Sequence, residues 1–252
     1  MNAYHRSALL TIAVFLPLVA AASGAQSRAS YRETAVADGG VISGVVRFDG
    51  PRPTAEQLTA TTKEPVCHRD PIFSEKLVVS DTNTIKWAVV SIKGITEGKP
   101  FPDDDGKGHA GPTLDQAGCV YRPHVVVVPR GKPLRILNSD GVLHNVHTWP
   151  RKNRPKNIAM PGMIKETKLR FRRPERVRTT CDIHTWMEAW IIVSAHPYYA
   201  VTDEKGEFKL TDVPPGTYTL ELWHETLGTV GKTVTVRSKA ETRVEFTLSA
   251  SR

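Results

Sequence analysis

Three residues with metal-ligating side chains lie in one seven-residue stretch, Cys181-Asp-Ile-His-Thr-Trp-Met. Cys181, His184 and Met187 offer a thiolate, an imidazole and a thioether, each three residues after the last. Sulfur ligands favour soft metal ions such as Cu(I), whereas imidazole suits Cu(II) and Zn(II). Taken alone, the spacing also fits a buried cysteine and methionine beside a surface histidine. A ligand from another part of the chain would make this stretch a metal site.

The best candidate for that further ligand is His144, which follows Asn138-x-Asp140 and precedes Asn145. A strand ending in Asn-x-Asp, then His-Asn, then a later Cys-x-x-His-x-x-Met resembles the cupredoxins, most closely the amicyanin type. The resemblance covers roughly a third of the chain, and its motifs fall in the expected order. It implies that Asn145 ties the two ligand-bearing loops together. The copper ligands implied by the resemblance are His144, Cys181, His184 and, in the axial position, Met187.

The chemistry of this ligand set supports a single copper ion. Two imidazoles and one thiolate in a plane, with a weak thioether above it, suit both Cu(I) and Cu(II). Structural zinc sites need four strong ligands, often several of them thiolates, and the Cys-x-x-Cys-His of a c-type haem is absent. Asp182-Ile183 stands where small copper proteins often have a pair ending in proline. We expect this difference to alter loop stiffness and reduction potential without removing a ligand.

The N-terminus predicts export. The apolar run Ser7–Ala22 is short and poorly flanked for a membrane span, and Ser23-Gly24-Ala25 offers small residues for cleavage, which favours a cleaved signal over the alternative of an uncleaved anchor. Residues 1–25 are therefore expected to be a signal peptide, which would leave a periplasmic or secreted protein that is not integral to the membrane. In an oxidising compartment two of three cysteines normally pair. We expect Cys67 to pair with Cys119, because Cys181 has the neighbours that could use a thiolate.

The positive charge of the chain, +8 overall, is concentrated in Arg151–Arg178, which holds 11 Lys and Arg residues against 2 Glu. In an exported protein such a segment favours an acidic protein or another anionic partner over nucleic acid. A well-solvated basic strand and loop is an equally acceptable interpretation, because charge runs are common.

The chain is expected to be all-β, since short β-branched runs alternate with turn residues and no helical periodicity is evident. Gly98–Gly118 is rich in glycine, proline and aspartate and predicts a loop. The expected strands are Val41–Phe48, Lys76–Val79, Trp87–Ile92, Val125–Val128, Leu134–Leu137, Lys168–Phe171, Ala189–Val193, Lys232–Val236 and Arg243–Leu248, with a strand–turn–strand over 200–210 and a further strand after Val213-Pro-Pro-Gly.

The C-terminal part resembles the carboxypeptidase regulatory-like domain, a transthyretin-like β-sandwich, through Thr202–Phe208 and Val213–Tyr218. The opening strand typical of such domains occurs far upstream, as Gly40–Val46. Either the domain is split by an insertion over residues 110–195, or Val41–Phe48 is an edge strand of the middle domain. The expected divisions are a flexible segment at 26–39, a β segment at 40–109, a cupredoxin-like Greek-key sandwich at 110–195 and a regulatory-like sandwich at 196–250.

Three functions fit these observations. The first is single-copper electron transfer with an acidic redox partner and no enzymatic activity, in which electrons pass at the exposed edge of a histidine ligand. The second is an envelope module that binds a glycan or a protein and uses copper as a structural element. The third is a Cu(I) carrier. His147 is either an exposed relay residue near the copper or a polar residue at a strand edge.

Overall fold

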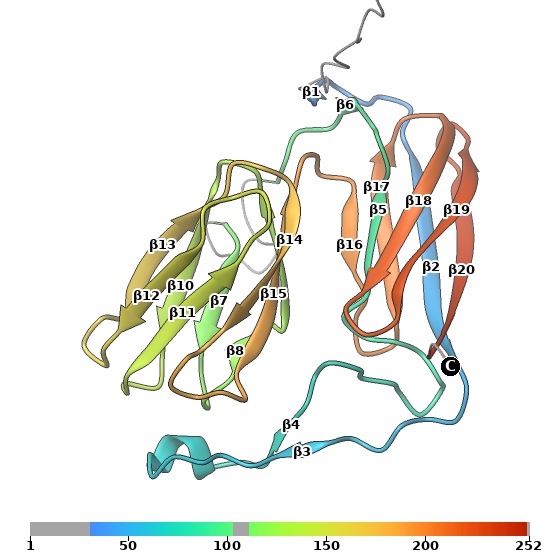
Figure 1. The fold of residues 1–252 in the computed structure, drawn as a ribbon. Coiled ribbons are helices and arrows are strands. Elements are labelled where there is room, and N and C mark those ends of the chain that lie inside the picture. The colour runs from blue at the N-terminus through green and yellow to red at the C-terminus, as the bar shows by residue number, and fades with distance from the viewer. Residues whose placement is uncertain (1–30, 103–110, 251–252) are drawn as a thin grey trace, which may run out of the picture.

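The computed structural model describes residues 31–102 and 111–250. The expected signal peptide and the start of the N-terminal segment lie outside these residues. Within the described part, the helical structure is one 3-10 turn, η1 (Pro65–His68), and the other elements are β-strands. None of the described residues forms a helix with the length and apolar character needed to cross a membrane. The fold class is therefore all-β, with two β-sandwiches side by side (Figure 1).

One sandwich, here called the terminal sandwich, combines strands from both ends of the chain. Its sheets have the strand orders β16-β5-β18-β19 and β17-β2-β20. The early strand β2 lies between β17 and β20 and pairs with β20 in parallel. The strands are β2 (Gly40–Asp49), β5 (Val89–Ile92), β16 (Tyr199–Val201), β17 (Glu207–Val213), β18 (Gly216–His224), β19 (Gly228–Val236) and β20 (Glu241–Ser249).

The other sandwich, here called the inserted sandwich, lies between β5 and β16 in sequence. Its sheets have the orders β13-β10-β7-β8 and β12-β11-β14-β15-β9. The strands are β7 (Thr113–Gln116), β8 (Tyr121–Arg122), β9 (Val125–Pro129), β10 (Pro133–Asn138), β11 (His144–Trp149), β12 (Lys156–Met160), β13 (Glu166–Arg170), β14 (Glu175–Thr180) and β15 (Glu188–Ser194). Two minor sheets pair β1 (Arg32–Glu33) with β6 (Glu97–Gly98), and β3 (Gln57–Leu58) with β4 (Ile72–Phe73).

Alternation of apolar side chains explains how each sandwich forms its core. In β10 Leu134 and Ile136 point inward, and in β20 Val244 and Phe246 do the same. Burial of one such side chain contributes about 1.5–3 kcal/mol. Gly44 in β2 marks a close approach of two strands, since a Cβ there would lie 1.9 Å from the Val244 carbonyl oxygen. The second glycine of the regulatory-like pattern, Gly44, is thus required by packing.

Two of the expected local structures are wrong. Lys76–Val79 forms no strand, because Val79 makes a single bridge to Ile85 before the chain turns back at Ser80. Within the expected loop Gly98–Gly118, the short strand β7 alternates intermediate and buried residues and pairs with β10. Strands β11, β12 and β14 are not predicted from the sequence, because their many polar residues obscure the alternation of buried and exposed side chains.

The two sandwiches meet through a small apolar cluster that contains Trp190 and Trp223, whose rings lie edge to face with centroids 5.0 Å apart. Glu225 joins the two sides, because it accepts a hydrogen bond from Trp190 Nε1 and contacts His124 Nε2. Arg176 on β14 pairs with Glu221 on β18. The interface therefore combines apolar contact with buried hydrogen bonds and a half-buried ion pair.

The segment that links β2 to β5 runs beneath the end of the inserted sandwich (Figure 1). Residues 57–73 of this segment, here called the strap, contain β3, η1 and β4. A disulfide joins Cys67 in η1 to Cys119 in the inserted sandwich and confirms the expected pairing. Cys181 is a free, buried cysteine. The disulfide fixes the strap against the sandwich at the end where the candidate ligands lie.

Candidate metal centre

The loop between β14 and β15 holds three of the candidate ligands in a closed turn. The Cys181 amide donates to the Met187 carbonyl at 3.3 Å, and the Met187 amide donates to the His184 carbonyl at 2.8 Å. The His184 amide also donates to Cys181 Sγ at 3.4 Å. These bonds fix the spacing of the loop without any bound ion, and the amide at sulfur favours the thiolate.

His144 begins β11 and reaches the same place from a different loop. The side chain of Asn138, at the end of β10, donates to the carbonyls of Val142 and Met160 and holds the intervening turn. Gly162 allows the neighbouring loop to approach, because a Cβ there would lie 1.9 Å from the Gly141 carbonyl oxygen. Asn138 therefore positions His144 by holding the turn that precedes β11.

The side chains of His144, Cys181 and His184 converge. Their candidate ligand atoms all lie within 4.8 Å of one another. The two Nδ1 atoms are 2.9 Å apart, and Cys181 Sγ is 4.0 Å from His184 Nδ1. Metal–nitrogen bonds of about 2.0–2.1 Å can join two nitrogens at that separation to a single ion. Met187 is fully buried in the same core cluster and closes the loop through its backbone.

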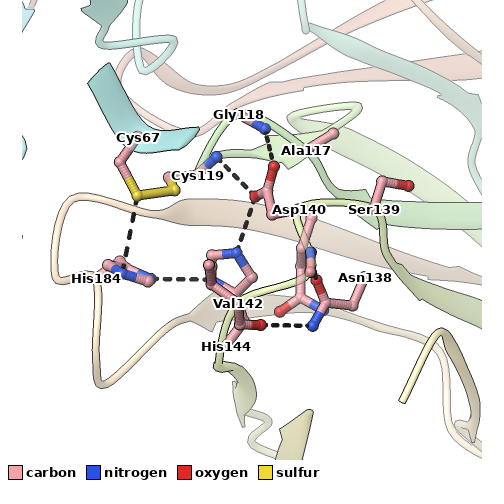
Figure 2. Close-up of polar contacts among 12 residues, drawn as sticks. Cys67, Ala117, Gly118, Cys119, Asn138, Ser139, Asp140, Val142, His144 and His184 are labelled. Carbon is pink, nitrogen blue, oxygen red and sulfur yellow. Dashed lines mark hydrogen bonds and ion pairs between the residues drawn. A yellow bond between two sulfur atoms is a disulfide. The ribbon is translucent and has the colours of Figure 1, made fainter. Parts of the chain in front are cut away.

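Asp140 orients His144 from behind. Its Oδ2 accepts a hydrogen bond from His144 Nε2 at 2.9 Å, and its two carboxylate oxygens accept the amides of Gly118 and Cys119 (Figure 2). With Nε2 occupied, His144 turns Nδ1 toward the other ligands. Burial would raise the pKa of Asp140, but these hydrogen bonds outweigh it and lower that pKa. The sequence pattern indicates Asp140 only as part of the Asn-x-Asp motif and does not show that it holds His144.

Metal binding needs a thiolate and neutral imidazoles; the surroundings favour these states for Cys181 and His184 but favour the protonated state for His144. Burial would raise the pKa of Cys181, but hydrogen bonds from His144 and from backbone amides lower it. Burial and the neighbouring charge of His144 lower the pKa of His184. Burial opposes protonation of His144, yet Asp140 and Cys181 raise its pKa to about 8. In the metal-free protein one proton is therefore held on His144 at neutral pH, facing His184.

Asn145 connects the two loops, as the sequence predicts. Its Oδ1 accepts the Asp182 amide at 2.7 Å and the Cys181 thiol at 3.2 Å. Its Nδ2 donates to Asn157 Oδ1 and to Asp182 Oδ2. The residue after each ligand, Asn145 after His144 and Asp182 after Cys181, is thus fixed by the other loop.

The prediction that a histidine ligand has an exposed edge at which electrons pass is wrong. The exposed fraction is 0% for His144 and 1% for His184. His184 Nε2 faces the disulfide, 4.0 Å from Cys67 Sγ (Figure 2). Trp186 covers the same side, because its ring centroid lies 5.1 Å from that of His184 and its Nε1 donates to the Cys119 carbonyl. Sequence reasoning could not foresee that the strap would close over this ring.

Two further groups of metal-ligating side chains overlap this cluster. One is Cys67, Cys119 and His184, and the other is Cys119, Asp140 and His144. Because Cys67 and Cys119 share a disulfide, neither is available as a thiolate. The donor set that fits a metal is therefore the pair of imidazoles with Cys181.

His147 lies outside this donor set. Its Nδ1 contacts Asp182 Oδ1 at 2.9 Å, and its ring stacks on Trp149 with centroids 3.9 Å apart. It is partly exposed on the side of β11 away from the core. The stacked pair with Trp149 was not anticipated from the sequence.

Comparison with known proteins gives one family match and several structural neighbours. Residues 188–249 match the carboxypeptidase regulatory-like domain. The match begins at β15 and so includes one strand of the inserted sandwich. A search of curated proteins found no match.

The structural neighbours are cupredoxins, and each is a partial match. The copper-containing nitrite reductase NirK from Thermus scotoductus SA-01 shares 21% identity over 33% of this chain and 22% of its own, with a TM-score of 0.29. A Cu(I) amicyanin mutant shares 21% identity over 42% of this chain and 98% of its own, with a TM-score of 0.30. A purple cupredoxin from Nitrosopumilus maritimus shares 19% identity over 38% and 94%, with a TM-score of 0.26.

Proposed function

We propose that this protein is an exported electron-transfer protein that binds one copper ion and catalyses no reaction of its own. The observation that carries the proposal is the convergence of two imidazole nitrogens and one cysteine sulfur in a buried cluster. His144, Cys181 and His184 would hold the ion, with Met187 as the axial ligand. Bound copper would supply one-electron exchange between Cu(I) and Cu(II).

The residues around the ligands support this role. Asp140 fixes the His144 ring, and Asn145 fixes the position of Cys181. Ligands held in this way need little rearrangement when the charge at the site changes. The ligands are also almost completely shielded from solvent, which gives a substrate no direct access. Burial therefore favours electron transfer over catalysis at this site.

Two features outside the site support export and an acidic partner. The Cys67–Cys119 disulfide is of a kind that persists in oxidising compartments. The basic segment Arg151–Arg178 belongs to β12, β13, β14 and their connections, so it forms part of the surface of the inserted sandwich. Charges on such a surface speed encounter with a partner of opposite sign.

The test is titration of the protein, lacking residues 1–25, with Cu(II) while the visible spectrum is recorded. We expect an intense thiolate-to-copper band that saturates at one equivalent. The Cys181→Ser variant should lack the band, whereas His147→Gln, which changes a histidine outside the donor set, should keep it. Absence of the band from the unmodified protein would overturn the proposal and favour a binding module. Rapid loss of Cu(I) to a chelator would favour a carrier.

A further inference from the structure

The closed histidine edge raises the question of how an electron reaches the site. His184 Nε2 lies against the disulfide, and His144 Nε2 is bonded to the buried carboxylate of Asp140. Both rings are almost completely buried. An electron must therefore cross intervening protein atoms, and tunnelling falls off more slowly along covalent and hydrogen bonds than across gaps.

One such bonded connection leads from Cys181 to the surface. Thr180 precedes Cys181 in the chain, and its Oγ1 accepts a hydrogen bond from Trp149 Nε1 at 2.9 Å. Trp149 ends β11 and is 48% exposed. Covalent bonds and one hydrogen bond thus link the thiolate to an aromatic ring at the surface.

The residue on the other side of Cys181 leads to the same aromatic group. Asp182 contacts His147 Nδ1 at 2.9 Å, and the His147 ring stacks on Trp149 with an interplanar angle of 27°. Both chain neighbours of the thiolate are therefore bonded to one stacked pair. This pair, His147 with Trp149, is here called the aromatic pair.

The aromatic pair adjoins a groove of about 830 Å³ between the two sandwiches, and Trp149 forms part of its wall. Arg151 and Lys152, two and three residues after Trp149 in sequence, are exposed and line the groove. Arg176 and Arg178 also line it, but each is paired with a glutamate. The positive charge available to a partner thus lies beside the exposed ring.

Two other surface residues near the ligands are weaker candidates. Trp186 lies beside His184, but its indole donates to the Cys119 carbonyl, and the pocket around it contains Glu56, Glu75 and Glu188 against one lysine, Lys76. Leu143 is 47% exposed and precedes His144, but its aliphatic side chain forms no hydrogen bond. Charge and bonding together favour Trp149.

We propose that the aromatic pair is the electron port of this protein and that an acidic one-electron redox protein docks at the basic mouth of the groove. The inference rests on the proposed function. In each transfer the partner loses one electron and the metal centre gains one, or the reverse. No covalent bond forms or breaks, and no proton needs to move. Thr180 is a positioning residue that links Trp149 to Cys181.

The first test uses the copper-loaded protein and hexacyanoferrate, an anionic one-electron probe, in stopped-flow experiments. Thr180→Val removes the hydrogen-bond acceptor at nearly constant volume, and Trp149→Phe removes the donor but keeps a ring. Both should slow transfer several-fold without changing the visible spectrum. Lys152→Glu should slow it and weaken its salt dependence. The matched control Lys168→Glu, on β13 of the opposite sheet, should not.

The second test uses the metal-free protein. The fluorescence of Trp149 is the difference between the emission of the unmodified protein and that of Trp149→Phe. It should be quenched more strongly by iodide than by caesium, because cations surround the ring. Lys152→Glu should reduce this preference. The Trp149 indole N–H resonance should shift in Thr180→Val, which reports the hydrogen bond independently of any transfer rate.

The outcomes separate the two proposals. Absence of the copper band would overturn the proposed function and the port with it. A normal band with wild-type transfer in Thr180→Val and Trp149→Phe would overturn the port alone. The port would also be overturned if transfer were slowed only in Trp186→Phe or Leu143→Ser. Binding of polygalacturonate in the groove, with transfer unaffected by Lys152→Glu, would identify a glycan site instead.

Discussion

His224 in the terminal sandwich and His144 in the inserted sandwich are both almost completely buried, but their surroundings differ. His224 Nδ1 accepts weak hydrogen bonds from the amides of Thr226 and Leu227, and among the described residues its Nε2 has no partner. His144 has both ring nitrogens engaged, one by Asp140 and one by His184.

The difference shows what distinguishes a packed histidine from a ligand. Burial lowers the pKa of His224 to about 4, so it is neutral in the folded protein. His144 is as deeply buried, yet its partners raise its pKa to about 8. Burial alone disfavours the charged form of a histidine, whereas hydrogen bonds and opposite charges around the ring stabilise that form. The same surroundings, between His144, His184 and Cys181, can stabilise a bound cation.

The largest effect in the inserted sandwich should follow loss of the disulfide. Cys67 and Cys119 are separated by 52 positions in sequence, and closing such a loop contributes about 4 kcal/mol in the chain-entropy description. The double variant Cys67→Ala/Cys119→Ala should lower the free energy of unfolding by about that amount. Denaturant titration of the metal-free protein measures it.

The same variant tests whether the strap closes the site. With the strap released from the sandwich, Cys181 in the metal-free protein should react faster with iodoacetamide under native conditions. The matched control is the unmodified protein, in which Cys181 is the free thiol. An unchanged alkylation rate would show that the strap does not control access to the ligands.

The next effect concerns acid and the terminal sandwich. His224 has an ordinary pKa of 6.5 when unfolded and about 4 when folded, so the unfolded chain takes up a proton first as pH falls. Its contribution is therefore complete above pH 6.5 and is lost toward pH 4, by about 3 kcal/mol. Burial lowers the pKa of His196 to about 4 as well, which adds to the same trend.

Denaturation midpoints between pH 7 and pH 4 measure this loss. His224→Asn keeps an oxygen that can accept the amides of Thr226 and Leu227 but cannot take up a proton. Its stability should therefore fall less steeply with acid than that of the unmodified protein. Parallel pH profiles for the two proteins would contradict the structural account of His224.

The sequence predicted those parts of the molecule that depend on local pattern. His144, Cys181 and His184 stand in short motifs, and strands such as β10 and β20 have clear alternation. The pairing of Cys67 with Cys119 was predicted, but the cover that the strap gives to His184 was not, because the sequence does not show which way that ring points. The contact of Trp149 with Thr180 depends on the pairing of β11 with β14, two strands whose polar residues conceal them in the sequence.

The smallest effect separates two aspartates near the ligands. Asp140 is buried and bonded to His144, whereas Asp182 is more exposed and pairs with His147. In the metal-free protein, Asp140→Asn should lower the free energy of unfolding at pH 6 by about 2 kcal/mol, since it weakens buried hydrogen bonds to a charged group. The control Asp182→Asn should cost less than about 1 kcal/mol, because the pair is partly solvated.

The two aspartate variants should also differ in how their stability changes with pH. Because His144 has a raised pKa of about 8 when folded and an ordinary 6.5 when unfolded, its stabilising effect is complete below pH 6.5 and is lost as pH rises through 8. This direction is opposite to that of His224. Asp140→Asn should remove most of the decline between pH 6 and pH 9, and Asp182→Asn should retain it. Equal declines in both variants would mean that Asp140 does not hold the proton on His144 and that the two sandwiches bury their histidines alike.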